Sequence, residues 1–170
     1  MSKMTQDEID KILELHAAWL GNREGGKSAN LTSANLSGAD LYGANLSRAN
    51  LSGANLNDVK DGVLILLRTS IVPQVGQFIG WKKCRNQVIV KLMIGENARR
   101  SNATGRKCRA EYVKVLEVFG GEFGVSIYNN TVQYEVGKIV RCDKWNEDRW
   151  VECGGGIHFY LTREEAAAHE

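Results

Sequence analysis

A five-residue repeat constrains the fold of this 170-residue chain more than any other feature of its sequence. Residues 28–57 read SANLT SANLS GADLY GANLS RANLS GANLN, with Leu at every fifth position from Leu31 to Leu56. A period of five fits neither an α-helix nor a β-strand. It requires a coil in which each Leu, and the Ala two residues before it, returns to an inward position. Asn or Asp, Ser and Gly are expected at the corners, where side chains can bond to the backbone and tight turns are tolerated.

This A-(N/D)-L-x-x pattern resembles the pentapeptide-repeat family, whose members form a right-handed, four-sided β-helix. The resemblance implies about four pentapeptides per coil, so the repeat would make only about one and a half coils. The family is best known for imitating duplex DNA, a role that needs a long and strongly negative rod. Residues 28–57 carry one acid, Asp40, and one base, Arg48, and would span only about 10 Å. We therefore do not expect DNA mimicry by this segment.

The ends of such a coil expose apolar faces and need caps. Upstream, Thr5 and Glu8 form a capping box that opens a helix with apolar residues at helical spacing. His16 and Trp19 lie on its apolar stripe, so we expect both to pack on the first coil, with His16 bonded to a backbone group there. Downstream, the apolar run at residues 63–67 is expected to close the other end.

The remaining hundred residues predict a separate, mainly β domain of the α+β type. A capping box from Thr162 to Glu165 opens a closing helix that runs through Ala168. Apolar or alternating runs predict the strands: 88–94, 112–119, 124–128, 132–136, 139–142, 149–152 and 157–161.

A basic segment is the first candidate site in this domain. Residues 98–109 hold five cations and no acid, with small hydrogen-bonding residues between them. Guanidinium groups and backbone N–H groups in a Gly/Ser/Thr loop suit phosphates or carboxylates. The predicted anion-binding residues are Arg99, Arg100, Arg106, Lys107 and Arg109. The alternative is a solvated loop with internal ion pairs, which is what charge runs usually are.

A glycine-rich segment is the second candidate site. Gly154, Gly155 and Gly156 precede a strand and allow close backbone approach, as next to a ligand. His158 follows and alternates with two apolar neighbours, so it could act as a general base, with Tyr134 or Glu135 as partners. A lone His in a strand more often has a structural role. We therefore keep both interpretations open, a catalytic role and a structural one.

The cysteines and the amino-terminal residues indicate where in the cell the chain is expected. Cys84, Cys108, Cys142 and Cys153 lack the short spacing of zinc knuckles, so no metal and no cofactor are predicted. The first residues are polar and acidic rather than a secretory signal, and no long apolar run occurs. We therefore expect a cytoplasmic protein with free thiols and no contact with a membrane.

Four motifs of the second part, WKKC, ARRSNATGRKCRAEYVKVLEV, YEVGK and CGGGIHFYLTREEA, resemble a carboxy-terminal domain of viral, phage and bacterial proteins. That domain often follows pentapeptide repeats and has no known function. The resemblance implies a phage or prophage origin. GIHFY and LTREEAA are also similar to the strand–helix end of ADP-ribosyltransferase-like folds, although the other catalytic strands of that family have no counterpart here.

The sequence thus predicts a mainly β (α+β) protein in three parts. These are a capping helix and lead-in at 1–27, a pentapeptide-repeat β-helix and exit at 28–72, and a carboxy-terminal domain at 73–170. The predicted function is non-catalytic binding of an anionic partner through the basic loop, the partner being a nucleotide, a nucleic acid or an acidic protein surface. The repeat would organise or dimerise the chain. The alternative is a nucleotide- or NAD-using enzyme, ADP-ribosyltransferase-like, centred on Gly154–His158.

Overall fold

The computed structural model describes residues 2–60 and 69–169, which divide into two compact units. The first unit comprises Met1–Ile71 with two later segments, Asn102–Gly105 and Asp148–Glu152, and the second unit holds the rest of the chain. The described residues are mainly β with few helices. No helix within these ranges has the length and apolar character that a membrane crossing requires. The apolar run at 63–67, expected to cap the repeat, lies outside the described residues.

Helix α1 (Gln6–Leu20) opens the first unit, and its capping box is formed as predicted. Thr5 accepts from the Glu8 amide while the Glu8 carboxylate accepts from the Thr5 amide, and Gly21 ends the helix. His16 is fully buried: Nε2 donates to the Ser47 carbonyl, and Nδ1 accepts from the Ala29 amide, 3.1 Å away in each case. Trp19 stacks on the His16 ring. The prediction that His16 bonds to the backbone of the coil is confirmed.

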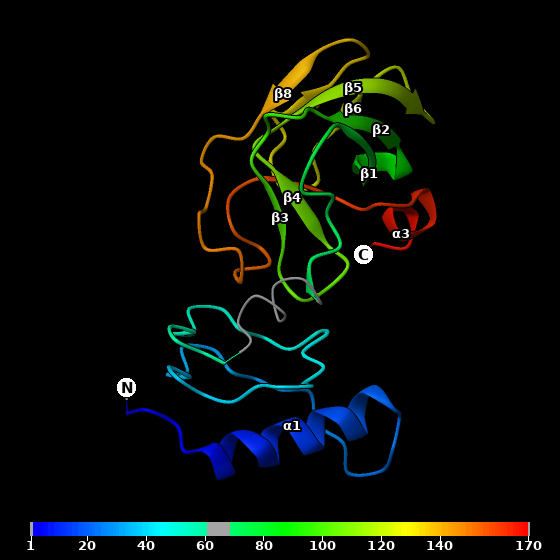
Figure 1. Cartoon of the computed structure of the whole chain (residues 1–170). Coiled ribbons are helices and arrows are strands. Elements are labelled where there is room, and N and C mark those ends of the chain that lie inside the picture. Colours follow the sequence, from blue (N-terminus) through cyan, green and yellow to red (C-terminus); the bar gives the residue numbers. More distant parts are fainter. Residues whose placement is uncertain (1, 61–68, 170) are drawn as a thin grey trace. The chain divides into compact units, whose positions relative to one another are not determined.

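The repeat has the inward Leu and the polar corners that its period predicts. Five inward side chains are buried and form one core with Ile9 of α1: Leu31, Leu36, Leu41, Leu46 and Leu51. Figure 1 shows α1 in blue alongside the backbone of the repeat. The Asn or Asp before each Leu accepts from the amide two residues later, which fixes each corner. The residue two positions after each Leu has a positive φ, which favours glycine: Ser33, Gly38, Gly43, Arg48, Gly53 and Asp58.

Successive turns of the repeat pair at a spacing of twenty residues. Isolated parallel bridges join Asn30 to Asn50, Asn35 to Asn55 and Asp40 to Lys60. Amides of one turn donate to carbonyls of the next, as from Leu31 to Asn50 and from Leu36 to Asn55. The described repeat residues form these bridges without a continuous strand. Four pentapeptides therefore separate paired positions.

Two short segments far along the chain complete the first unit. The amide of Arg48 donates to the Thr104 carbonyl, and Ser52 Oγ donates to the Trp150 carbonyl. Trp150 also packs against the Leu core of the repeat. The predicted strand at 149–152 is therefore wrong. That stretch is a turn, because its backbone and its Trp side chain are used on the repeat instead of in a sheet.

The second unit contains three small sheets. One has the order β1-β2-β5-β8, the second β3-β4-β9, and the third is the pair β6-β7. Their strands are β1 (Phe78–Lys83), β2 (Ile89–Ile94), β3 (Arg100–Asn102), β4 (Cys108–Ala110), β5 (Tyr112–Phe119), β6 (Gly124–Val125), β7 (Gln133–Tyr134), β8 (Ile139–Arg141) and β9 (Ile157–Phe159). A 3-10 turn, η1 (Arg85–Gln87), joins β1 to β2. The predicted strands at 88–94, 112–119, 139–142 and 157–161 are each present in shorter or equal form.

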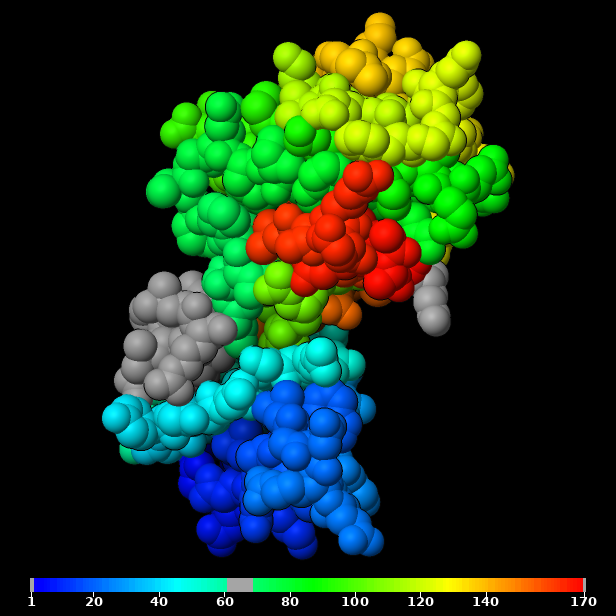
Figure 2. All heavy atoms as spheres, turned by 90° about the vertical axis from the view of Figure 1, so that its right-hand side faces the viewer, coloured from blue at the N-terminus to red at the C-terminus, as the bar shows by residue number. Residues whose placement is uncertain are grey.

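The first two sheets meet where β1 passes β9. Trp81 and Tyr160 exchange two backbone hydrogen bonds of 2.7 Å. A Cβ on Gly80 would lie 2.6 Å from the Phe159 ring, so only glycine permits this approach. Helix α3 (Arg163–Ala167) packs on β1, and Figure 2 shows the red carboxy-terminal residues against the green surface of this unit. The Thr162–Glu165 capping box is present, as predicted.

The basic segment 98–109 is not one loop, contrary to the prediction. It contains β3 and the first two residues of β4, and all three residues of β4 are buried. β4 pairs with β9, with Cys108 opposite Phe159 and Arg109 opposite His158. The charges along the segment suggested a loop, but Cys108, Arg109 and Ala110 are all buried in β4, which pairs with β9.

Candidate functional site

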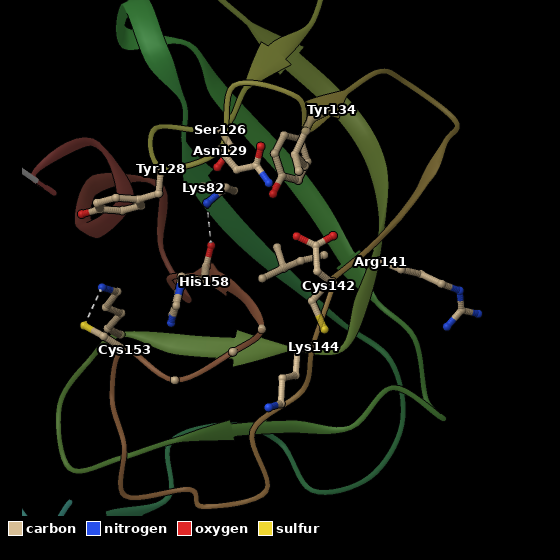
Figure 3. Close-up of a pocket in the computed structure, with 17 residues that line it drawn as sticks. Lys82, Ser126, Tyr128, Asn129, Tyr134, Arg141, Cys142, Lys144, Cys153 and His158 are labelled. Atoms are coloured by element: carbon tan, nitrogen blue, oxygen red, sulfur yellow. Dashed lines mark hydrogen bonds between the residues drawn. The ribbon is translucent and has the colours of Figure 1, made fainter.

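The second unit contains a cavity of about 480 Å³, large enough for a small organic ligand. It lies among β1, the segment that includes β6 and β7, the residues that follow β8, and the glycine-rich segment before β9 (Figure 3). Its basic lining residues are Lys82, Lys107, Arg141 and Lys144, and the acidic one is Asp143. The site therefore has an excess of positive charge.

Lys82 of β1 is the least accessible cation of this cavity, with 8% of its surface exposed. Its Nζ donates to the His158 carbonyl at 3.2 Å and lies 5.6 Å from the centre of the Tyr134 ring. Burial lowers the pKa of Lys82, because water no longer solvates the ammonium, and the nearby charge of Lys107 lowers that pKa further. The thiol of Cys84 has the opposite effect on this pKa, while burial raises the pKa of Cys84 itself to about 11.

The surroundings of Lys82 carry a positive field. His169 near the end of the chain shows this, since its pKa is lowered first by burial and then by the charges of Lys107, Lys82 and Lys83. Lys83 is used structurally, because its Nζ donates to the carbonyls of Ala167 and His169 at the end of α3. A bound anion would relieve this repulsion between like charges.

Figure 3 shows how the labelled side chains lie around the amine of Lys82. Ser126, Asn129 and Tyr134 lie on one side of it, and His158 lies on the other. The guanidinium of Arg141 points away from the cavity and is 4.5 Å from the Tyr112 ring. The positive charge offered to a ligand therefore comes from lysines rather than from Arg141.

The glycine-rich segment lines the cavity, but its glycines are needed for close packing against other protein atoms. A Cβ on Gly155 would lie 2.2 Å from the Lys144 carbonyl oxygen. Gly156 has a φ of +151°, and a Cβ there would lie 3.1 Å from the Arg109 side chain. The close approach predicted for this segment is thus to neighbouring protein atoms, and it fixes the wall of the cavity.

The five predicted anion-binding residues do not gather in one place. Arg99 pairs with Glu111 at 3.1 Å and also with Glu147, and Arg106 pairs with Glu165 at 2.5 Å. These pairings raise the pKa of both guanidinium groups, chiefly through the hydrogen bonds to Glu111 and Glu165.

The other three predicted residues differ from one another in their contacts. Arg100 donates to the carbonyls of Gly76 and Glu96. Arg109 is 1% exposed and donates to the carbonyls of Asn146 and Gly155. Its guanidinium also lies 4.7 Å from the Trp145 ring, so its charge holds the segment behind the cavity instead of facing solvent. Lys107 lines the cavity, 3.4 Å from the Cys153 sulfur.

Two of the three catalytic candidates line the same cavity. His158 of β9 and Tyr134 of β7 both do so, whereas Glu135 is exposed and is not among the lining residues. Tyr134 is buried, and burial raises its pKa. The structure thus brings His158, Tyr134, Lys107 and Gly154–Gly156 together and leaves Glu135 outside.

Sequence reasoning did not single out Lys82, although a weak signal was present. In the stretch FIGWKKC, a period of two places Gly80, Lys82 and Cys84 on one face of a strand. A lysine between a glycine and a cysteine on an inward face indicates a buried amine. Ser126, Asn129 and Lys144 were also not predicted as site residues, because they come from segments outside the strands that only the folded chain brings together.

Metal ligation has no support in the part of the chain that the structure describes, where no three His, Cys, Asp or Glu residues are grouped to hold an ion. Cys142 and Cys153 line the cavity as free thiols. Burial, with a smaller effect of Glu111, raises the pKa of Cys142.

Together, a five-residue repeat and a β-rich unit with a lysine-lined cavity define a mainly β repeat protein. Comparison with protein families agrees with both parts. Residues 27–60 match the pentapeptide repeats, and residues 68–166 match a family described as "Family of unknown function (DUF5758)". Because the second match covers more than half of the chain, the protein belongs to that family. Comparison with curated proteins and with solved structures gave no match.

Proposed function

We propose that this protein acts by binding, and that its second unit holds a small anionic ligand in the lysine-lined cavity. The observation that carries the proposal is the buried ammonium of Lys82, which has a backbone carbonyl and an aromatic ring beside it. Among the described residues, the charges that affect its pKa are those of Cys84 and Lys107, and none is a carboxylate. A buried cation without an opposite charge is costly, and an anion entering the cavity would remove that cost.

The cavity is a better candidate for the anion site than the basic segment 98–109. The guanidinium groups of Arg99 and Arg106 are engaged by Glu111, Glu147 and Glu165. An external anion would have to displace those carboxylates before it could bind. Lys82, Lys107 and Lys144 line one cavity together, and among the described residues none of the three forms an ion pair. We therefore keep the prediction that the partner is an anion, but we propose that it binds in the cavity instead of at residues 98–109.

Calorimetric titration of the full chain with inorganic phosphate and with AMP tests this proposal. We expect Lys82→Met to weaken binding about tenfold to a hundredfold, the loss typical of one hydrogen bond to a charged group. Lys144→Met removes a second lining charge without changing the buried position, so it keeps the test valid if Lys82→Met folds poorly. Lys114→Met, an exposed lysine of β5 outside the cavity, is the matched control. Equal affinity in all variants, or no binding of either anion, would contradict the proposal.

A nucleotide- or NAD-using enzyme is the second candidate function, favoured by the shared cavity of His158, Tyr134 and Gly154–Gly156. Incubation with NAD and with ATP, followed by mass spectrometry for ADP-ribose or nucleotide products, tests it. Turnover that His158→Ala abolishes would support the enzyme. Unchanged NAD and ATP would count against it.

We also propose that the repeat is a short, right-handed, four-sided β-helix that organises the chain. The twenty-residue spacing of its three parallel bridges supports this, because it corresponds to four pentapeptides in each coil. Hydrogen exchange checks it: the amides of Leu31, Ser33, Leu36 and Gly38, which donate to the next turn, should exchange far more slowly than their neighbours at the corners. Dimerisation through the repeat, a cytoplasmic setting and a phage or prophage origin stay predictions.

A further inference from the structure

Lys82 combines three properties that a salt-bridging lysine does not have. It shares the buried face of β1 with Gly80, and it is almost fully buried itself. It nevertheless lines a cavity large enough for a small molecule. An ammonium has three N–H donors, and the described residues offer Nζ one hydrogen bond, to the His158 carbonyl. Part of the amine therefore remains available to a molecule in the cavity.

The same surroundings favour the neutral amine. Desolvation and the charge of Lys107 both lower the pKa of Lys82, so more of this side chain is unprotonated at a given pH than for a lysine in water. An unprotonated amine has a free electron pair and is a nucleophile. Desolvated lysines in apolar pockets act in this way toward carbonyl compounds.

We propose that Lys82 forms a reversible imine with a small aldehyde or α-keto acid that enters the cavity, an inference that rests on the proposed binding of anions there. The Nζ electron pair attacks the carbonyl carbon, a C–N bond forms, and the π pair of the C=O bond moves to oxygen. The oxygen then leaves as water, carrying both amine hydrogens, and the C=N bond forms. The reaction is a condensation, so it needs no oxidant, reductant or co-reactant.

The lining residues indicate why the carbonyl compound would carry a negative charge. Lys107 and Lys144 line the cavity with Lys82, and Asp143 is the single acid among the lining residues. A carboxylate beside the carbonyl group could pair with one of these lysines while the carbonyl carbon meets Nζ of Lys82. Once the imine forms, the buried nitrogen no longer has to be charged, which relieves the repulsion from Lys107.

Trapping with borohydride tests the proposal on the full chain. Glyoxylate is the anionic probe and propionaldehyde the neutral one, and reduction converts any imine into a stable secondary amine that peptide mass mapping assigns to a lysine. We expect glyoxylate to label Lys82 several-fold faster than the exposed Lys114, because desolvation leaves more of Lys82 unprotonated and the other lining lysines attract the carboxylate. Lys82→Arg should remove this label, and Lys114→Arg should leave it unchanged. Site mapping on the unsubstituted chain needs no variant to fold.

The outcomes separate this inference from the function on which it rests. Fast glyoxylate labelling at Lys82 supports the imine. Glyoxylate that raises Tm but labels Lys82 no faster than Lys114 overturns the imine and leaves anion binding in place. Equal labelling of Lys82 by propionaldehyde and glyoxylate, without phosphate binding, supports the imine and overturns the anionic class. No labelling and no binding overturns both.

Discussion

The two units of this chain place different chemistry in their interiors. The repeat unit buries Leu and Ala at positions set by a period of five. Its buried titratable group within the described residues, His16, is bonded on both ring nitrogens. Among the described residues, the buried charged side chains are Lys82 and Arg109, and both belong to the second unit. A periodic sequence assigns each inward position to packing. The second unit has no such period, so individual inward positions can hold a charged residue. One of them, Lys82, lines its cavity.

The largest expected effect is on stability, and it compares the loss of a buried apolar side chain with the loss of a buried charge. Leu36 is fully buried in the repeat core, so Leu36→Ala should lower the free energy of unfolding by about 3 kcal/mol. Lys82→Met should be neutral or slightly stabilising, because an apolar side chain of similar length replaces a buried charge. Urea unfolding followed by circular dichroism measures both. If Lys82→Met costs as much as Leu36→Ala, then Lys82 holds the fold, and the contrast between the units is wrong.

A second prediction concerns the late segment that packs on the repeat. Trp150 contacts the Leu core, so Trp150→Ala should cost about 2 kcal/mol, less than for a fully buried Trp. Tyr42 of the same unit is 78% exposed, and Tyr42→Ala should change stability by less than about 0.5 kcal/mol. Thermal unfolding compares the two aromatic residues. Equal effects would mean that Trp150 contributes no more than a surface residue.

The third prediction is a pH dependence of the repeat unit. Burial lowers the pKa of His16 below its ordinary 6.5, against a smaller opposing effect of its bond to Ser47. The unfolded chain therefore binds a proton more readily than the folded one. Stability should fall as the pH drops through about 6.5 and should continue to fall until the pH reaches the lowered pKa of the folded state.

His16→Gln checks this assignment, because glutamine does not titrate. The variant should be less stable at pH 7.5, since one of the two backbone bonds is weakened, but its unfolding free energy should change less between pH 7 and pH 5. A pH profile parallel to that of the unsubstituted chain would assign the titration to another group.

The smallest predicted effect compares the two capping boxes. Thr5→Ala removes the cap of a fifteen-residue helix and should cost about 1 kcal/mol. Thr162→Ala acts on a five-residue helix that Lys83 and Arg106 also hold, so about 0.5 kcal/mol is expected. Chemical unfolding of both variants measures the difference. A larger loss for Thr162→Ala would show that α3 depends on its cap more than on these cations.

The repeat could be predicted from the sequence because each of its constraints is local. Leu at every fifth position, an Asn or Asp before it and a positive-φ corner, which is Gly at three of six positions, all lie within one pentapeptide. The capping boxes at Thr5 and Thr162 are equally local. Such patterns can be read without knowledge of distant contacts.

The cavity could be predicted only in part, since its walls depend on distant contacts. His158, Tyr134 and the three glycines were singled out by residue type. Lys82 becomes buried because β1 meets the end of β9, a contact that Gly80 permits and that no local pattern shows. Arg99 and Arg106 were predicted to bind an anion because their ion pairs with Glu147 and Glu165 join residues that are far apart in the sequence.

The closing contacts of the first unit have a consequence for how the chain folds during synthesis. Ser52 and Trp150 are 98 residues apart, and Gly53 and Asp148 are 95 apart. At a rate of about 5–20 residues per second, the ribosome needs roughly 5–20 s to make the intervening chain. During that interval the repeat lacks the Trp150 side chain that packs on its Leu core. A nascent chain stalled before residue 148 should therefore hold a repeat that chaperones bind and proteases cut, because residues 148–152 are needed to complete a unit whose repeat is made first.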